Sequence, residues 1–330
     1  MKTILVLGGA GYIGSHTVYE LIDGGYDVAV ADKLETGFIE AVHPKARFHK
    51  GDIRDKSFID SVFDAEKIDA VIHFAANSQV GESMIKPLKY YENNMGGTRT
   101  MLQSMVEHGV KYIVFSSTAA IYGEPERVPI MESDPTHPTN CYGETKLSME
   151  RMFHWTSVAH DIHFVALRYF NACGAHPNGN IGEAHDPETH LIPIVLQVPN
   201  GQRKTVNIFG DDYGTRDGTC VRDYIHVCDL ASAHVLAAEY LMNGGKNDVF
   251  NLGNGVGFTV REIVDAAEKV VGKPIACEIA SRRAGDPAQL VASSEKAKTV
   301  LGWKPKYDDI DTIISTAWRW HSTHPCGYKA

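Results

Sequence analysis

The sequence predicts a doubly wound parallel α/β fold. Through the first half of the chain, short and nearly continuous apolar runs alternate with amphipathic stretches. This pattern is typical of parallel strands buried on both faces by helices. A glycine cluster follows the first apolar run directly, and after about residue 172 the chain becomes turn-rich. That change indicates a boundary before a smaller α/β substrate domain.

Six apolar runs of strand length define the predicted sheet. They are Thr3–Leu7, Asp27–Ala31, Ala46–Lys50, Ala70–Phe74, Lys111–Ser116 and His163–Leu167. Helices are predicted to start near Tyr12, Lys56, Pro87 and Tyr142. We therefore expect residues 1–172 to form the sheet domain, to which later segments return, and residues 173–330 to form the second domain.

Composition excludes several classes of partner. The 330 residues carry a formal net charge of -9 and no long basic run, which argues against nucleic acid or an anionic membrane. Six cysteines lack CxxC spacing and sixteen histidines lack a metal-ligand spacing, so neither a disulfide framework nor a metal site is expected. The chain shows no signal-peptide pattern and no apolar segment of membrane-spanning length. We expect a cytoplasmic protein with reduced thiols.

The glycine cluster predicts a dinucleotide site in a Rossmann-like fold. Gly8, Gly11 and Gly14 lie between the first strand and the first helix, and Gly9 completes a GxGxxG pattern. Glycines at these positions allow a tight turn and close approach of the backbone to a pyrophosphate, and the helix N-terminus offers free N–H groups. A glycine-rich turn without a ligand is the alternative.

Acidic residues follow the next two strands. Asp32 ends the second strand, where a carboxylate accepts hydrogen bonds from the adenosine ribose and repels a 2′-phosphate, which favours NAD over NADP. Lys33 beside it softens that preference. Asp52 follows the third strand and is predicted either to contact adenine or to cap a helix.

Tyr142 and Lys146 are the candidate general base and its cation. They are four residues apart in a predicted helix and therefore share a face. Moving a phenol pKa from ~10 to ~7 requires about 4 kcal/mol, and one positive charge ~6 Å away supplies about 2.8 kcal/mol at an effective dielectric of ~20. Lys146 and an oxidised nicotinamide ring together would suffice. Tyr and Lys at this spacing are also common on solvated helix faces.

Thr118 ends the fifth predicted strand, twenty-four residues before Tyr142. A hydroxyl at the carboxyl edge of a parallel sheet faces the crevice in which such folds bind ligands. Thr118 is therefore predicted to hydrogen-bond the substrate oxygen that Tyr142 deprotonates. A hydroxyl that only caps the strand end is the alternative.

These residues carry a family resemblance that extends from residue 3 to the C-terminal HPCGY. The glycine turn with Thr118, Tyr142 and Lys146 resembles the extended short-chain dehydrogenase/reductase family. Further motifs narrow the resemblance to the UDP-glucose 4-epimerases of that family: VIHFAA (71–76), VGES (80–83), YYENN (90–94), LRYFN (167–171), GAHP (174–177), DGTCVRDYIHV (217–227) and RRAGD (282–286).

The resemblance implies an isomerase that interconverts UDP-galactose and UDP-glucose by transient oxidation at C4 with tightly bound NAD. Residues implied at the NAD site, besides Tyr142 and Lys146, are Gly8, Gly11, Tyr12, Ile13, Gly14, Asp32, Lys33, Asp52, Ile53, Phe74, Ala75, Ala76, Ser78, Asn94, Ser116 and Tyr169. Residues implied at the UDP-sugar site, besides Thr118 and Tyr142, are Phe170, Asn171, His190, Leu191, Asn207, Phe209, Arg222, Arg283, Asp286 and Leu290. Family members commonly pair as homodimers, here through helices near Leu88–His108 and Lys146–His160.

Several implied roles have alternatives. Arginines suit a diphosphate and Asp286 suits a ribose, but Arg222 is also predicted to pair with Asp223 or Asp217. Leu290 is implied beside C2 of the sugar, where its bulk disfavours N-acetylhexosamines, but it also suits a core. The GNGVG segment (253–257) lacks the Lys-Ser/Thr of a phosphate loop and is interpreted as a turn.

The chain departs from the family pattern at two positions. Ser78 stands where many epimerases have a lysine, so a weaker hold on NAD is expected, and Thr118 stands where the family often has serine. A 4,6-dehydratase needs an acid and a base after the hydroxyl residue, and Ala119 and Ala120 supply neither. A UDP-uronate epimerase or decarboxylase remains an alternative. A non-enzymatic NAD-binding regulator is disfavoured because Tyr142 and Lys146 are both present.

Overall fold

The first strand shows how the central sheet is buried. In the computed structural model, which describes residues 1–283 and 287–329, strand β1 (Thr3–Leu7) is entirely buried. Ile4 and Val6 point into one hydrophobic core, while Leu5 and Leu7 point into another. This alternation is the period of two expected of a strand, and it places apolar side chains on both faces of the sheet.

Seven strands form the central sheet, in the order β11-β6-β5-β4-β1-β2-β3. Every neighbouring pair in it is parallel. Besides β1, the strands are β2 (Asp27–Asp32), β3 (Arg47–Lys50), β4 (Ala70–His73), β5 (Tyr112–Ser116), β6 (His163–Tyr169) and β11 (Asp248–Leu252). The order reverses between β1 and β4, and the carboxyl ends of strands at such a switch point form the crevice where these folds bind ligands.

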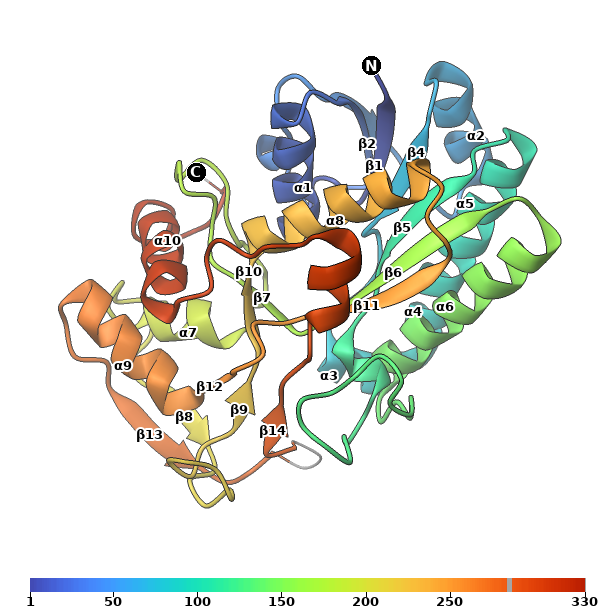
Figure 1. Cartoon of the computed structure of the whole chain (residues 1–330). Coiled ribbons are helices and arrows are strands. Elements are labelled where there is room, and N and C mark those ends of the chain that lie inside the picture. Colours follow the sequence, from blue (N-terminus) through green and yellow to red (C-terminus); the bar gives the residue numbers. More distant parts are fainter. Residues whose placement is uncertain (284–286, 330) are drawn as a thin grey trace.

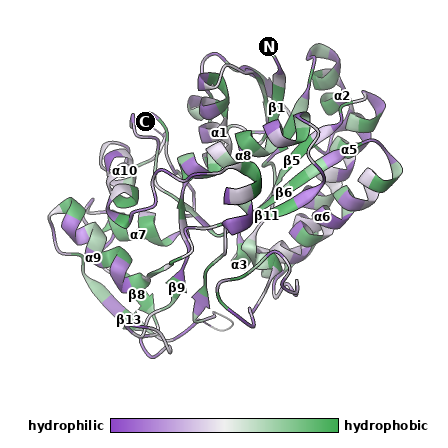
Figure 2. Ribbon diagram, in the orientation of Figure 1, coloured by the Kyte–Doolittle hydropathy of each residue, from purple (hydrophilic) through white to green (hydrophobic). Residues whose placement is uncertain are grey.

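Helices cover both faces of this sheet (Figure 1). Helices α1 (Tyr12–Asp23) and α8 (Val227–Met242) pack together and share the core that contains Ile4 and Val6. The opposite core takes side chains from α2 (Lys56–Ala65), α5 (Gly97–Glu107) and α6 (Cys141–Ala159). Before α5 the chain passes through α3 (Val80–Ile85), α4 (Pro87–Tyr90) and a π-helical turn, η2 (Tyr91–Gly96). Figure 2 shows green, hydrophobic segments in the central strands and purple, hydrophilic stretches along the surrounding helices.

The later part of the chain forms smaller sheets. Strand β7 (Asn171–Cys173) pairs with β10 (Tyr224–His226), and β8 (Val206–Phe209) pairs with β13 (Cys277–Ala280). Strand β9 (Val221–Arg222) lies between β12 (Phe258–Thr259) and β14 (Gln289–Leu290). Helices α7 (Leu191–Gln197), α9 (Val260–Val271) and α10 (Ile310–Thr323) build a third core here. Short helical turns occur at η1 (Ile39–Ala41), η3 (Ala119–Ile121) and η4 (Ala297–Leu301).

The predicted strands and helix starts agree closely with this architecture. β1 has the predicted bounds, and α1, α2 and α4 start at Tyr12, Lys56 and Pro87 as expected. α8 and β11 come from beyond residue 173. β11 is an edge strand of the seven-stranded sheet, and α8 packs against that sheet. Within residues 1–283 and 287–329, we find no helix with both the length and the apolar character needed to cross a bilayer.

Candidate active site

The glycine-rich turn between β1 and α1 leaves no room for side chains. Gly8 has φ of +80°, and a Cβ on it would lie 2.7 Å from the backbone nitrogen of Ala75. A Cβ on Gly14 would lie 2.2 Å from the carbonyl oxygen of Gly8. Gly11 is the N-cap of α1 and no side chain caps the helix, so its first-turn N–H groups are available to an anion. This cradle fits the pyrophosphate of a dinucleotide.

Substituting Gly14 by alanine is expected to destabilise this turn. The new Cβ must displace the Gly8 backbone, and such overpacking costs about 1–3 kcal/mol. We expect the affinity for NAD to fall roughly tenfold or more, measured by titration calorimetry. Gly96→Ala is the matched control, because no atom lies within 4 Å of its added Cβ and its backbone is helical. Unchanged NAD affinity in the Gly14 variant would contradict the assignment.

Asp32 lies at the carboxyl end of β2, where it was predicted. Its two oxygens accept hydrogen bonds from the backbone N–H of Ala10, at 3.1 Å, and of Leu34, at 2.8 Å. Burial raises the pKa of this carboxyl, and the backbone donors oppose the rise. Lys33 donates to Asn93 at 3.1 Å and forms an ion pair with Glu35. Asp32 therefore links the glycine turn to the strand end where a ribose would lie.

The prediction that Asp52 caps a helix is wrong. Asp55 is the N-cap of α2 and accepts from the backbone of Ser57 and Phe58. Asp52 instead pairs with Arg54 at 2.7 Å, which lowers the pKa of Asp52, and it lies 4.0 Å from Lys33. Its carboxylate remains at the end of β3, where the adenine contact was predicted.

The other residues predicted at the NAD site open α1, follow β3 and β4, or end β5 and β6. Ile53 is buried against Gly97, and Phe74 packs on His234 with ring centroids 4.6 Å apart. The side chains of Ser116 and Tyr169 hydrogen-bond to each other. Tyr12 donates to the carbonyl of Gly174 at 2.6 Å, while Ile13, Ala75 and Ala76 are half-buried and Ser78 is exposed.

Asn94 is fully buried and bridges two parts of the site. It accepts from the Asn77 backbone N–H at 2.8 Å, and its amide donates to the Asn77 carbonyl at 3.1 Å and to Thr145 at 3.0 Å. It therefore connects the segment after β4 with α6, the helix that carries Tyr142.

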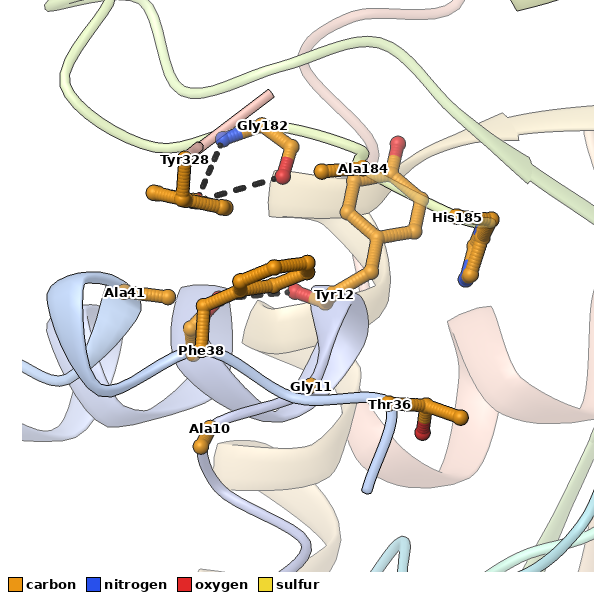
Figure 3. A pocket seen from close by; sticks show the side chains of 11 residues that line it. Ala10, Gly11, Tyr12, Thr36, Phe38, Ala41, Gly182, Ala184, His185 and Tyr328 are labelled. Atoms are coloured by element: carbon orange, nitrogen blue, oxygen red, sulfur yellow. Dashed lines mark hydrogen bonds between the residues drawn. The ribbon is translucent and has the colours of Figure 1, made fainter. Parts of the chain in front are cut away.

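A cavity adjoins the glycine-rich turn (Figure 3). Gly11 and Tyr12 line it from the N-cap and first residue of α1, and Phe38 lines it from the loop after β2. His185 and Tyr328 line it from distant parts of the chain. The Tyr328 hydroxyl accepts from the Gly182 N–H at 3.0 Å. Segments far apart in sequence therefore meet beside the start of α1.

Tyr142 and Lys146 lie on the first turns of α6, which begins after an Asn140 cap that accepts from the Gly143 N–H at 2.8 Å. Lys146 is buried and donates to the carbonyl oxygen of Ser116 at 2.8 Å. Its Nζ lies 5.9 Å from the centroid of the Tyr142 ring. Thr118 follows β5, its hydroxyl accepts from the backbone N–H of Ala120 at 3.2 Å, and its side chain lies near enough to Tyr142 to affect the pKa of that phenol. The fold thus brings all three predicted catalytic residues together at the carboxyl edge of the sheet.

Burial has the largest effect on the pKa values of Tyr142 and Lys146. It raises the pKa of Tyr142 to about 12, and the Thr118 side chain opposes the rise. Burial also lowers the pKa of Lys146 to about 7, which the charge of Glu150 opposes. The expected lowering of the Tyr142 pKa by Lys146 is therefore not seen in the chain alone, because both charged forms lose hydration. A further positive charge is needed before Tyr142 works as a base at neutral pH.

Glu150 is a buried acid that the sequence analysis missed. It accepts from Ser117 at 2.5 Å and forms a bidentate pair with Arg168, at 3.0 and 2.6 Å. Arg168 also donates to the hydroxyl of Tyr122 at 2.9 Å. The signal that could have found Glu150 is its spacing: Tyr142, Lys146 and Glu150 recur every four residues and therefore share one face of α6.

Residues predicted to bind the UDP-sugar lie on strands of two of the smaller sheets and on the segments beside them. Leu290 on β14 is in register with Arg222 on β9, and Leu290 packs on the cluster that contains Ala119. The Arg283 guanidinium lies 3.9 Å from the centroid of the Phe209 ring, at the end of β8. Asn207 is on the same strand, and its side chain is exposed. Phe170 packs on the same cluster as Leu290.

Arg222 donates to the carbonyl of Pro287 at 2.9 Å. Asp223, one of its predicted alternative partners, accepts instead from the backbone N–H groups of Asn254, Gly255 and Ala292. Those bonds support the interpretation of residues 253–257 as a turn. The amide of Asn171 donates to the Asp223 carbonyl at 3.0 Å.

His190, Leu191 and Asp286 were also predicted at the UDP-sugar site, and the structure describes the first two. The His190 side chain lies at the N-terminus of α7 with Glu183 and Glu188, 2.9 Å from each, and Leu191 begins that helix. Asp286 lies outside the described residues.

Comparison with known proteins gives a consistent result. The model of the NAD dependent epimerase/dehydratase family matches residues 4–253. UDP-glucose 4-epimerase of Halalkalibacterium halodurans is 60% identical over 326 residues, covering 99% of this chain and 97% of the relative. The same enzyme of Lacticaseibacillus casei is also 60% identical, covering 99% and 98%.

Solved structures of UDP-glucose 4-epimerases are similar to the structure of this chain. A crystal structure of a UDP-glucose 4-epimerase superposes with a TM-score of 0.98 at 56% identity and covers 100% of both chains. The UDP-glucose 4-epimerase of Bifidobacterium longum in complex with NAD⁺ and UDP gives a TM-score of 0.93 at 41% identity, covering 99% and 100%.

Proposed function

Because this chain belongs to the NAD dependent epimerase/dehydratase family, we propose that it interconverts UDP-galactose and UDP-glucose. It is an NAD-dependent isomerase that oxidises C4 of the sugar transiently, lets the 4-keto sugar rotate and reduces it from the other face. The observation that carries the proposal is the grouping of Tyr142, Lys146 and Thr118 beside a dinucleotide cradle, in a chain that matches UDP-glucose 4-epimerases over nearly its whole length.

NAD, when bound, supplies a reversible hydride acceptor for C4 of the sugar. The residues that would hold its pyrophosphate are Gly8, Gly11 and Gly14 with the first turn of α1, and Asp32 would hold its adenosine ribose. Residues 1–172, with α8 and β11, form the proposed NAD-binding domain. The rest of residues 173–330 form the proposed UDP-sugar domain.

Tyr142 removes the proton of the C4 hydroxyl and returns it after rotation. Thr118 donates its hydroxyl hydrogen to the same substrate oxygen, while Lys146, held by Ser116, orients the nicotinamide ribose and adds positive charge. Ala119 and Ala120 carry no acid or base, so the ketone has no neighbouring group to promote elimination. Arg222 and Arg283 are proposed to bind the diphosphate by charge-assisted hydrogen bonds.

The decisive test supplies purified protein with UDP-galactose and no added NAD, then separates the products by chromatography. We expect UDP-glucose to accumulate until the two sugars reach equilibrium, because the cofactor is regenerated in each cycle. No conversion, even after NAD is supplied, would overturn the proposal. Conversion of UDP-uronates but not of UDP-galactose would favour the alternative substrate.

Leu290 is proposed to limit the sugars accepted. It packs on the same cluster as Ala119, the neighbour of Thr118, so its side chain borders the catalytic group. We expect Leu290→Ala to raise kcat/KM for UDP-N-acetylglucosamine relative to UDP-glucose by about 10- to 200-fold, the range for small changes in pocket volume. Val291→Ala is the control, because its side chain lies against Gly257 instead. Equal turnover of both substrates by the unaltered protein would show that Leu290 does not limit them.

A homodimer is proposed through α6 and the helical segment around α4 and α5. Large apolar side chains remain exposed there, with Leu88, Trp155 and Val158 exposed by 79%, 68% and 66%. A symmetric pairing would bury them against the same surface of a second copy. A monomer in sedimentation equilibrium would contradict this. We also propose a cytoplasmic location, supported by six cysteines that form no disulfide in the described part of the chain.

A further inference from the structure

Four potential metal ligands meet on one short segment between β7 and α7. Glu183, His185, Glu188 and His190 each offer one ligand atom, and these four atoms all lie within 4.8 Å of one another. The spacing, E-x-H-x-x-E-x-H, is neither a CxxC nor an HExxH pattern. The segment bends at Asp186 and Pro187, between the two pairs of ligand residues, before α7 begins.

The two carboxylates are buried. The Glu183 and Glu188 side chains are only 3% and 9% exposed. In the described parts of the chain, their ion pairs go only to His185 and His190, at 2.9 to 3.8 Å. Two buried negative charges need compensation, which either two imidazolium groups or one divalent cation can supply.

We propose that Glu183, His185, Glu188 and His190 form a binding site for a divalent transition metal, with Zn²⁺ as the ion that fits best. Two neutral imidazoles and two carboxylates around Zn²⁺ give a site of zero net charge. The nitrogen donors favour zinc over Mg²⁺ or Ca²⁺, which prefer oxygen ligands. Both histidines present Nδ1 to the carboxylates, so the same nitrogens face the point where the ion would lie.

The site is structural in character. Four protein ligands complete a tetrahedral zinc and leave no open position for a substrate, which is the arrangement of structural sites. The ligand segment also contacts the cofactor-binding half of the molecule. The His185 ring lies 6.1 Å from that of Tyr12, the first residue of α1, and both line the cavity of Figure 3. Trp320 of α10 donates to the Glu183 carbonyl at 2.9 Å.

A bound ion would therefore hold the segment before α7 in place between the start of α1 and α10. Its ligands include none of the proposed catalytic residues Tyr142, Lys146 and Thr118. Loss of the metal should consequently affect stability more directly than proton transfer.

The test measures metal content in the full-length protein after removal of any affinity tag. We expect about one zinc per chain by mass spectrometry, and a loss of at least tenfold in the His185→Ala/Glu188→Gln variant, since losing even supporting groups of a metal site costs roughly 10- to 100-fold in affinity. His163→Ala is the matched control, because His163 pairs with Asp161 at the surface. Retention of zinc by the double variant would overturn the proposal.

Spectroscopy of the unaltered protein tests the metal site by a measurement that does not depend on whether the variant folds. After chelation, Co²⁺ alone is titrated into the protein, and we expect the visible bands of a tetrahedral site. X-ray absorption of the zinc form should show two imidazoles in the first coordination shell. Absence of zinc in the purified protein together with absence of the Co²⁺ bands would overturn the site and leave the two imidazolium–carboxylate pairs as its occupants.

Discussion

Tyr142→Phe is expected to lower kcat by about 10²- to 10⁴-fold, the usual contribution of a general base. The substitution keeps the ring, whose centroid lies 5.9 Å from Nζ of Lys146, and removes only the phenol hydroxyl. Binding of UDP should change little, because the residues proposed to hold the nucleotide lie in the smaller sheets and not beside Tyr142. Turnover of UDP-galactose and calorimetric titration with UDP measure the two effects separately.

Tyr112→Phe is the matched control for this prediction. Tyr112 begins β5 on the same sheet and stacks on His163 with ring centroids 5.7 Å apart, outside the proposed site. It should retain full activity. A Tyr142 variant with turnover within tenfold of the unaltered protein would remove Tyr142 as the base.

Arg168→Met is expected to destabilise the protein by about 3–5 kcal/mol, because it leaves the Glu150 charge buried and unpaired. The two side chains are each only 7% exposed and make a bidentate contact. Removing the guanidinium also takes a donor from Tyr122. Urea unfolding followed by circular dichroism measures the loss.

Lys111→Met provides the comparison for an exposed pair. Lys111 and Asp161 form an ion pair in which the side chains are 51% and 64% exposed, and such pairs contribute about 0–1 kcal/mol. In the double variant Glu150→Leu/Arg168→Met the buried charge disappears, so stability should recover relative to Arg168→Met alone. Equal losses of unfolding free energy in the Arg168 and Lys111 variants would show that the buried Glu150–Arg168 pair contributes no more than an exposed pair.

Local patterns predicted the fold well. The period of apolar runs located β1 to β6, and the glycine cluster located the start of α1. Of the two roles predicted for Asp52, the helix cap is wrong, because Asp55 caps α2. Which aspartate caps the helix depends on the path of the chain out of β3, and two identical side chains do not reveal that path.

The candidate active site was predictable to a similar extent. Tyr142, Lys146 and Thr118 stand at fixed spacings after strands, so their meeting at one sheet edge follows from the topology of a parallel sheet. The protonation of Tyr142 and Lys146 did not follow, because pKa values depend on burial by residues distant in sequence. Glu150 lay in the right helical register, but its partner Arg168 is on another element.

The sequence by itself determined the sheet, the glycine-rich turn, the family and the candidate catalytic residues, because each depends on residues close together along the chain or on a resemblance along its whole length. Only the tertiary structure decided which polar groups share a buried environment. It joined Glu150 to Arg168, Phe209 to Arg283, and Glu183 to His190. Such contacts arise from packing between elements or from the path of a loop, and the free energy of a charge there is set by the surroundings that the fold creates.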